Sequence, residues 1–195
     1  MHLALFDFDG TLTTRDSFLP FLHHLAGTPG FAAGLARSSG PLLAYALRLM
    51  ANDAAKAQVV RQFMGGRSLA EVHEQGARYA REGLPRLLRP QTMAALAAHR
   101  EAGHTCVLVS ASLDVYLHPW AEQQGFDAVL CTSLAVDASQ RITGELHPRN
   151  CHGPEKVSRI HQWLAGRTPT HITAYGDSRG DREMLAMAQS PHWIG

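Results

Sequence analysis

The chain has 195 residues, of which 45% are hydrophobic and 18% charged, and 18 basic residues balance 17 acidic ones to a formal net charge of +1. These values exclude a chain that is disordered throughout, and the length predicts one domain with room for a modest insertion. The balanced charge does not steer the protein towards nucleic acid, so no nucleic-acid partner is expected. The three cysteines lack a C-x-x-C spacing, and we expect free thiols in a reducing compartment.

The first residues do not fit a secretion signal, because Asp7 and Asp9 interrupt the apolar run that opens the chain. We therefore expect a cytoplasmic protein. Residues 31–50 come nearest to a membrane-spanning segment, but arginines, serines and a Gly-Pro pair interrupt them, so stable membrane insertion is not expected. Packing inside the protein is the preferred interpretation of this segment, and an interfacial helix that touches lipid is the alternative.

Short apolar runs, each followed by small or acidic polar residues, predict buried parallel strands at residues 2–8, 105–109 and 171–175, with a fourth at 128–131. Amphipathic stretches predict helices at residues 90–102, 113–124 and 155–165. The alternation of strands and helices predicts an α/β fold with a doubly wound, Rossmann-like parallel sheet. Residues 134–146 are compatible with a hairpin that turns near residues 138–140.

The long stretch after the first strand contains no convincing strand pattern and is expected to be helical. Asp16 can cap a helix that runs to residue 24, and Asn52 or Asp53 can cap a helix over residues 54–63. Ser68 and Glu71 have the spacing of a capping box for a helix that runs to residue 81. We expect a helical cap at residues 15–84, inserted into a core formed by residues 1–14 and 85–195.

The segment DFDGTLT, residues 7–13, begins at the acidic tip of the first predicted strand. Carboxylates two residues apart on a strand point to opposite faces, unless the chain turns at Gly10 and lets Asp7 and Asp9 approach one centre. The polar clusters Ser110-Ala111-Ser112 and Gly176-Asp177-Ser178 follow two other strands. Open α/β sheets bind ligands outside the carboxyl ends of their strands, so these segments are expected to share one crevice.

Several carboxylates in one crevice repel one another and stay ionised together only around a cation. Carboxylate oxygens select Mg²⁺, which keeps some of its waters for a phosphate. Lys156, one of only two lysines among the basic residues, can supply positive charge from the opposite side. Ser110 and the amides at the start of the following helix can donate to phosphate oxygens.

Together these segments resemble the four motifs of the haloacid dehalogenase superfamily of hydrolases, in the family's order. DFDGTLT, SAS at residues 110–112, GPEK ending at Lys156 and GDSRGD at residues 176–181 carry the resemblance. The helical insertion is similar to the family's C1-type cap, and the EKVSRI and YGDSRGDREML segments are similar to the phosphoserine-phosphatase-like subfamily IB. The resemblance covers the whole chain.

The resemblance implies a Mg²⁺-dependent phosphomonoesterase in which Asp7 attacks phosphorus and Asp9 acts first as acid and then as base. It implies that Asp9 ligates the metal through its backbone carbonyl, that Asp181 is either a ligand or orients one, and that the Ala111 amide holds a phosphate oxygen. The candidate catalytic residues are Asp7, Asp9, Ser110 and Lys156, the candidate substrate-binding residues are Gly10, Thr11, Asp16, Ala111 and Ser112, and the candidate metal ligands are Asp7, Asp9, Asp177 and Asp181.

The acid at position 9 favours phosphate chemistry over dehalogenation, because an alkoxide leaving group needs a proton and a halide does not. The substrate is expected to be a small phosphorylated molecule. A phosphatase of lipid head-group phosphates, a phosphotransferase and a silent relative that only binds phosphorylated ligands or a protein remain alternatives, and the oligomeric state stays open. Lys56 is interpreted as a solvated helix residue, and the spacings of the twelve histidines match no compact metal motif.

Overall fold

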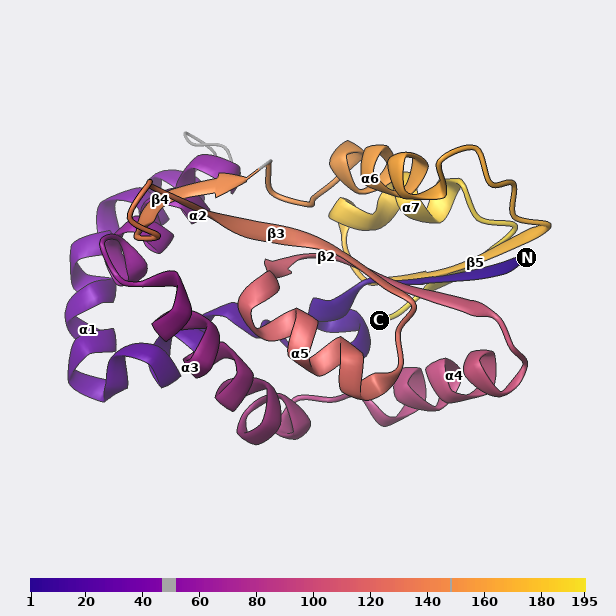
Figure 1. Ribbon diagram of the computed structural model, residues 1–195, viewed down its shortest axis with the longest axis horizontal. Coiled ribbons are helices and arrows are strands. Elements are labelled where there is room, and N and C mark those ends of the chain that lie inside the picture. Colours follow the sequence, from indigo (N-terminus) through magenta and orange to yellow (C-terminus); the bar gives the residue numbers. More distant parts are fainter. Residues whose placement is uncertain (47–51, 148) are drawn as a thin grey trace.

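The computed structural model describes residues 1–46, 52–147 and 149–195 (Figure 1). Within these residues six strands form one sheet in the order β4-β3-β2-β1-β5-β6, and only β4 runs antiparallel to its neighbour. This arrangement confirms the predicted α/β class. The strands are β1 His2–Phe6, β2 Thr105–Leu113, β3 Ala128–Val136, β4 Ile142–His147, β5 His171–Gly176 and β6 Ser190–Trp193.

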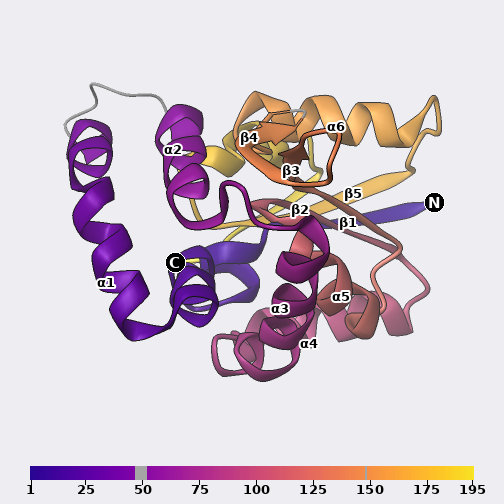
Figure 2. The same ribbon diagram turned by 60° about the vertical axis from the view of Figure 1, so that its left-hand side comes forward.

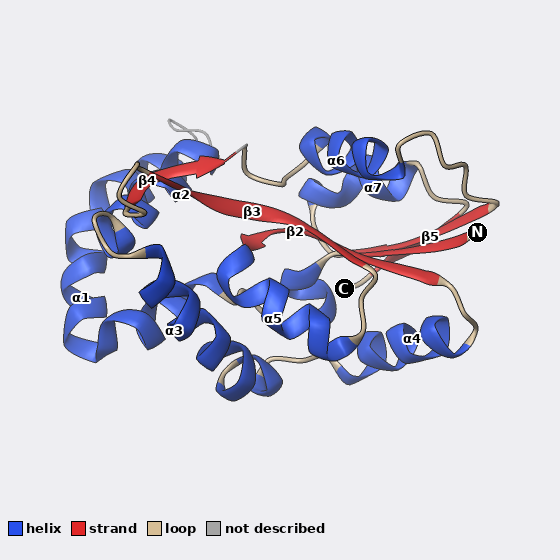
Figure 3. Cartoon of the chain, in the orientation of Figure 1, coloured by secondary structure: helices blue, strands red, loops and turns tan. Residues whose placement is uncertain are grey.

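The central strand β1 is buried on both faces because helices cover the sheet from two sides (Figures 1 and 3). Leu3 and Leu5 belong to a core cluster on one face, and Ala4 and Phe6 belong to the cluster on the other face. This alternation follows from the two-residue period of a strand. One face carries α6 Pro154–Leu164 and α7 Arg182–Ala186, and the other carries α4 Pro90–Glu101 and α5 Asp114–Gln124.

The segment predicted as a cap contains α1 Phe18–Ala46, which is interrupted at Gly27, α2 Asn52–Met64 and α3 Leu69–Glu82. Figure 2 shows α1 and α2 at one end of the molecule, and α3 beside α5. The α3 and α5 backbones approach closely at Gly76, where a Cβ atom would lie 2.2 Å from the carbonyl oxygen of Val115. The segment is therefore helical as expected, and its last helix packs directly on a core helix.

The predicted capping box at the start of α3 is wrong. Among the described residues the Ser68 side chain makes no capping hydrogen bond. Glu71 instead forms an ion pair with Arg67, and the backbone of Ser68 forms a bridge with Arg141 next to the turn of the hairpin. The hairpin itself is confirmed, because β3 and β4 pair in antiparallel register with Ser133 opposite His147.

The segment that raised the question of membrane contact lies mostly in α1. None of the helices that the structure describes is long and apolar enough to cross a bilayer. Part of residues 31–50, including Arg48, falls outside the described residues, so the interfacial alternative stays a prediction. The three cysteines, Cys106, Cys131 and Cys151, are buried free thiols.

Candidate active site

The chain makes a tight turn immediately after β1, and this turn brings the first motif to the second acidic motif. The amide of Asp7 continues the ladder by donating to the carbonyl oxygen of Tyr175 at 3.0 Å, and residues Phe8–Leu12 then form a single turn. Gly10 lies in this turn with a φ of +81°, and a Cβ atom there would lie 2.0 Å from Oδ2 of Asp177. Glycine is therefore required here both for its backbone angle and for the close approach of Asp177.

Asp7 is held on both of its carboxylate oxygens. Lys156 Nζ donates to Oδ1 at 2.6 Å, and Thr11 Oγ1 donates to Oδ2 at 3.0 Å. The Lys156 ammonium also donates to Oδ1 of Asp181 at 2.6 Å and to the carbonyl oxygen of Val109 at 2.8 Å. Lys156 is only 2% exposed, so its charge is neutralised by these buried partners rather than by water.

Asp177 completes a group of three carboxylates. Asp7, Asp177 and Asp181 each offer one oxygen, and these oxygens lie within 4.8 Å of one another. Oδ2 of Asp181 accepts from the amide and the hydroxyl of Ser178, whereas Oδ1 of Asp177 is buried with no hydrogen-bond partner among the described residues. A hard divalent cation fits this donor set, because it would pair the orphaned oxygen and offset the surplus negative charge.

The pKa values of these carboxyl groups and of Lys156 reflect burial and the surplus of negative charge. Burial raises the pKa of Asp7 to about 7 despite the adjacent Lys156, and burial followed by the charge of Asp181 raises the pKa of Asp177. Burial also opposes ionisation of Asp181, but Lys156 and the Ser178 donors hold its pKa below the ordinary value. Although burial disfavours its charge, the two carboxylates raise the pKa of Lys156. Burial and mutual repulsion thus disfavour the charge of Asp7 and Asp177, and a bound cation would favour it.

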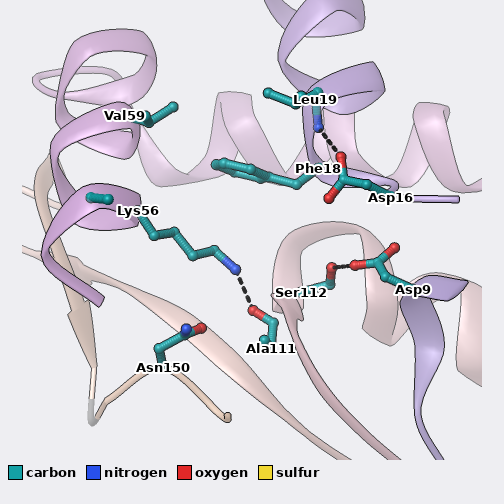
Figure 4. Close-up of a pocket in the computed structure, with 10 residues that line it drawn as sticks. Asp9, Asp16, Phe18, Leu19, Lys56, Val59, Ala111, Ser112 and Asn150 are labelled. Carbon is teal, nitrogen blue, oxygen red and sulfur yellow. Dashed lines mark hydrogen bonds between the residues drawn. The ribbon is translucent and has the colours of Figure 1, made fainter. Parts of the chain in front are cut away.

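Asp9 is separated from this group by its hydrogen bonds. Its Oδ1 accepts from the amide of Ser17 at 2.8 Å, and its Oδ2 accepts from the hydroxyl of Ser112 (Figure 4). Burial, and then the negative charge of Asp16, raise the pKa of Asp9. The side chain of Asp9 is thus held in one orientation, and its role as acid and base and the ligation of a metal through its backbone carbonyl stay predictions.

The hydroxyl groups predicted near the substrate divide into two kinds. Ser110 lines the same hollow as Asp7, Lys156 and Asp177, where its oxygen accepts from the amide of Ser112 at 3.0 Å. Thr11 is fully buried and its hydroxyl donates to Asp7, so it orients this carboxylate, and contact of Thr11 with substrate stays a prediction.

A second hollow of about 230 Å³ lies between the helical segment and the strand ends (Figure 4). Ser112 and Ala111 lie on its core side, together with Asp9. Asp16 lines it and also accepts from the amide of Leu19 at 2.8 Å, so helix capping and contact with the hollow are compatible. Phe18 and Val59 supply apolar surface on the helical side.

The expectation that Lys56 is a solvated helix residue is wrong. Its Nζ points into this hollow, donates to the carbonyl oxygen of Ala111 and lies 5.0 Å from the centroid of the Phe18 ring. Burial lowers the pKa of Lys56 even though Asp9 and Asp16 favour its charge. The rarity of lysine in this chain was the one sequence signal that pointed to it.

Asn150 is a second lining residue that the sequence did not single out. Its Oδ1 accepts from the hydroxyl of Thr132 at 3.0 Å, which fixes the amide orientation. Its Nδ2 is buried with no hydrogen-bond partner among the described residues. Lys56 and Asn150 thus both present nitrogen donors at the hollow, and a ligand oxygen would satisfy them.

A parallel sheet of this order, with carboxylates and a buried lysine at the carboxyl ends of its strands, defines a hydrolase class. The family model of haloacid dehalogenase-like hydrolases matches residues 4–186. The chain therefore belongs to this family, which confirms the resemblance that the motifs indicated.

Individual relatives and solved structures are similar to most of the chain. The chain is 39% identical over 186 residues to Protein CicA of Caulobacter vibrioides, a match that covers 95% of this chain and 82% of the relative. Its fold is similar to that of a Bordetella pertussis Tohama I protein of unknown function, with a TM-score of 0.83, 25% identity and coverage of 96% and 86% of the two chains. A phosphoserine phosphohydrolase-like protein from Francisella tularensis has a TM-score of 0.68, 17% identity and coverage of 99% and 86%.

Proposed function

We propose that the protein is a Mg²⁺-dependent phosphomonoesterase that forms an aspartyl-phosphate on Asp7. The observation that carries this proposal is the buried Asp7 carboxylate, held between Lys156 and Thr11 beside an Asp177 oxygen that has no hydrogen-bond partner among the described residues. Asp7 is oriented for attack, and the carboxylates beside it fit a cation that would bind the phosphoryl group. Fold similarity to a phosphoserine phosphohydrolase-like protein is consistent with this chemistry.

The reaction begins when an Asp7 oxygen forms a bond to phosphorus and the bond from phosphorus to the leaving oxygen breaks. Asp9 gives a proton to that leaving oxygen, and its raised pKa favours the protonated form that this step needs. Asp9 then takes a proton from water as the water oxygen attacks phosphorus and releases Asp7. Ser112 and the Ser17 amide hold the Asp9 carboxyl group in one orientation during both steps.

Two sets of groups would stabilise the negative charge of the phosphoryl group. Lys156 and Ser110 offer a positive charge and a hydroxyl donor, and a single preorganised donor of this kind typically contributes about 3–4 kcal/mol of barrier lowering. Asp7 and Asp177 would hold Mg²⁺, with the Asp9 carbonyl as a further ligand, and Asp181 would orient Lys156. When bound, the ion supplies neutralising charge for the phosphoryl oxygens.

The leaving group would occupy the hollow beside Asp9. Lys56 and Asn150 favour a small phosphate ester with a second anionic or carbonyl group, which is the chemistry of a phosphoserine-like substrate. One observation favours a second candidate, a lipid head-group phosphate: Leu19 lines the hollow and is 43% exposed, so an acyl chain would find apolar surface at the rim.

Phosphate release from a panel of phosphate esters, with Mg²⁺ and with EDTA, tests the proposal. We expect Asp7→Asn to abolish release and to prevent acid-stable phosphorylation of the protein, while Asp53→Asn on the exposed start of α2 retains parental turnover. Turnover of Asp7→Asn equal to the parent would refute the nucleophile assignment. Absence of release from every ester would favour the silent binding relative, and phosphoryl transfer to added alcohols would favour the phosphotransferase.

A further inference from the structure

A group of histidines lies at the amino ends of the strands, at the opposite edge of the sheet from the candidate active site. His2 and His171 are the first residues of β1 and β5 and pair in register, and His104 directly precedes β2. His99 reaches the same place from the last turn of α4. At about 3.3 Å per strand residue, His2 lies about 16 Å from Asp7. This group is therefore separate from the carboxylates.

Three of these imidazoles converge. The Nδ1 atoms of His99 and His104 lie 2.7 Å apart, and the rings of His2 and His104 are stacked with centroids 3.7 Å apart. His2, His99 and His104 each offer a ring nitrogen, and these nitrogens lie within 4.8 Å of one another. All three side chains are half-buried, so ions from solvent can still reach them.

In two of these rings, those of His2 and His99, the Nε2 atom is already hydrogen-bonded to a hydroxyl group. Nε2 of His2 is hydrogen-bonded to Oγ1 of Thr173 at 3.0 Å, and Nε2 of His99 is hydrogen-bonded to the Tyr175 hydroxyl at 3.0 Å. Histidines that bind metals usually have their other ring nitrogen tied in this way, which fixes the tautomer and the ring orientation. The remaining nitrogen of the His99 ring, Nδ1, lies at hydrogen-bond distance from Nδ1 of His104, so a bound ion would replace the hydrogen bond between these two nitrogens.

We propose that His2, His99 and His104 form a second metal site, which takes a divalent transition-metal ion such as Zn²⁺ rather than Mg²⁺. Imidazole nitrogen suits Zn²⁺, Ni²⁺ and Cu²⁺, whereas carboxylate oxygen suits Mg²⁺, so the two ends of the sheet select different ions. An ion bound here would join the starts of β1 and β2 to the end of α4. Its expected effect is to stabilise the folded chain, because it binds the native arrangement of residue 2 and residues 99–104, which are distant in the sequence.

Calorimetric titration with Zn²⁺ tests the proposal, using protein without a histidine tag, freed of metal by a chelator and held in excess Mg²⁺ to occupy the carboxylates. We expect one Zn²⁺ per chain and a rise in the melting temperature. His104→Gln is expected to weaken binding at least tenfold, and Thr173→Val, which removes only the bond that orients His2, about 10- to 100-fold. His73→Gln, on the exposed face of α3, is the matched control and keeps parental affinity.

The absence of Zn²⁺ binding, or equal affinity in His104→Gln and the parent, would overturn the proposal. If the variants fail to fold, NMR of the unaltered protein decides: Zn²⁺ must shift the ring resonances of His2, His99 and His104, and shifts confined to other histidines contradict the site. Mg²⁺-dependent phosphate release by His104→Gln without Zn²⁺ should equal that of the parent, so the site and the proposed phosphatase activity succeed or fail separately.

Discussion

Replacing Gly10 by alanine provides a direct test of the carboxylate site. The new Cβ atom would lie 2.0 Å from Oδ2 of Asp177, and real Cβ contacts essentially never fall below 3.0 Å, so the carboxylate must move by at least about 1 Å. Metal ligands tolerate displacements of only about 0.2 Å from their preferred distances. We therefore expect Gly10→Ala to weaken Mg²⁺ activation of phosphate release about 10- to 100-fold or more.

The substitution also places alanine at a φ of +81°, which typically costs about 1–3 kcal/mol of stability. Gly166→Ala separates the two effects, because Gly166 has a φ of +82° and a Cβ atom there would meet nothing within 4 Å. We expect both variants to lose stability from the positive φ in thermal unfolding with EDTA, with a further loss for Gly10→Ala from the contact with Asp177, but only Gly10→Ala to need more Mg²⁺. The same Mg²⁺ concentration for half-maximal activity in both variants would refute the assignment of Asp177 as a ligand.

Three further substitutions address the groups around phosphate and leaving group. Lys156→Met leaves Asp7 buried without its cation, so it should lower the free energy of unfolding by about 3–5 kcal/mol and kcat by about 10²- to 10³-fold. A melting temperature and a kcat that both equal those of the parent would contradict this role. Ser112→Ala removes a hydrogen bond to Asp9 worth about 1.5–3 kcal/mol, so steady-state kinetics should show a roughly ten- to hundredfold lower kcat with KM retained. Lys56→Met should raise KM about ten- to hundredfold for esters that carry a second anion and leave KM for p-nitrophenyl phosphate unchanged; equal KM changes for both substrates would exclude Lys56 as a selectivity residue.

The location of the candidate active site was predictable because it depends on topology rather than on side-chain detail. The strands β1, β2 and β5 run parallel and end at the same edge of the sheet, so polar residues at or just after their carboxyl ends must meet there. Asp7, Ser110 and Asp177 could therefore be placed together from their positions after apolar runs. The motifs in the sequence alone also indicated the family.

The hydrogen-bond and packing partners of individual side chains were harder to predict from the sequence. Thr11 was predicted to contact substrate, and the structure adds that the turn after β1 directs its hydroxyl to Asp7. Lys56 was predicted to be solvated, because the sequence around it reads as a plain helix and gives no information on where that helix packs. The group of His2, His99 and His104 was not predicted, because His2 begins β1 and lies far in sequence from His99 and His104, which flank the turn between α4 and β2.

The sequence by itself determined the α/β class, the strand ends at which chemistry occurs and the residue types gathered there, because apolar periodicity and turn residues act over short distances along the chain. Only the tertiary structure decided which charges pair and which side chains face a hollow. Lys156 and Asp7 are 149 residues apart and lie within 2.6 Å only because separate elements pack on one sheet. Hydrogen bonding and ion pairing depend on ångström distances between such elements, and the local pattern of residues does not specify those distances.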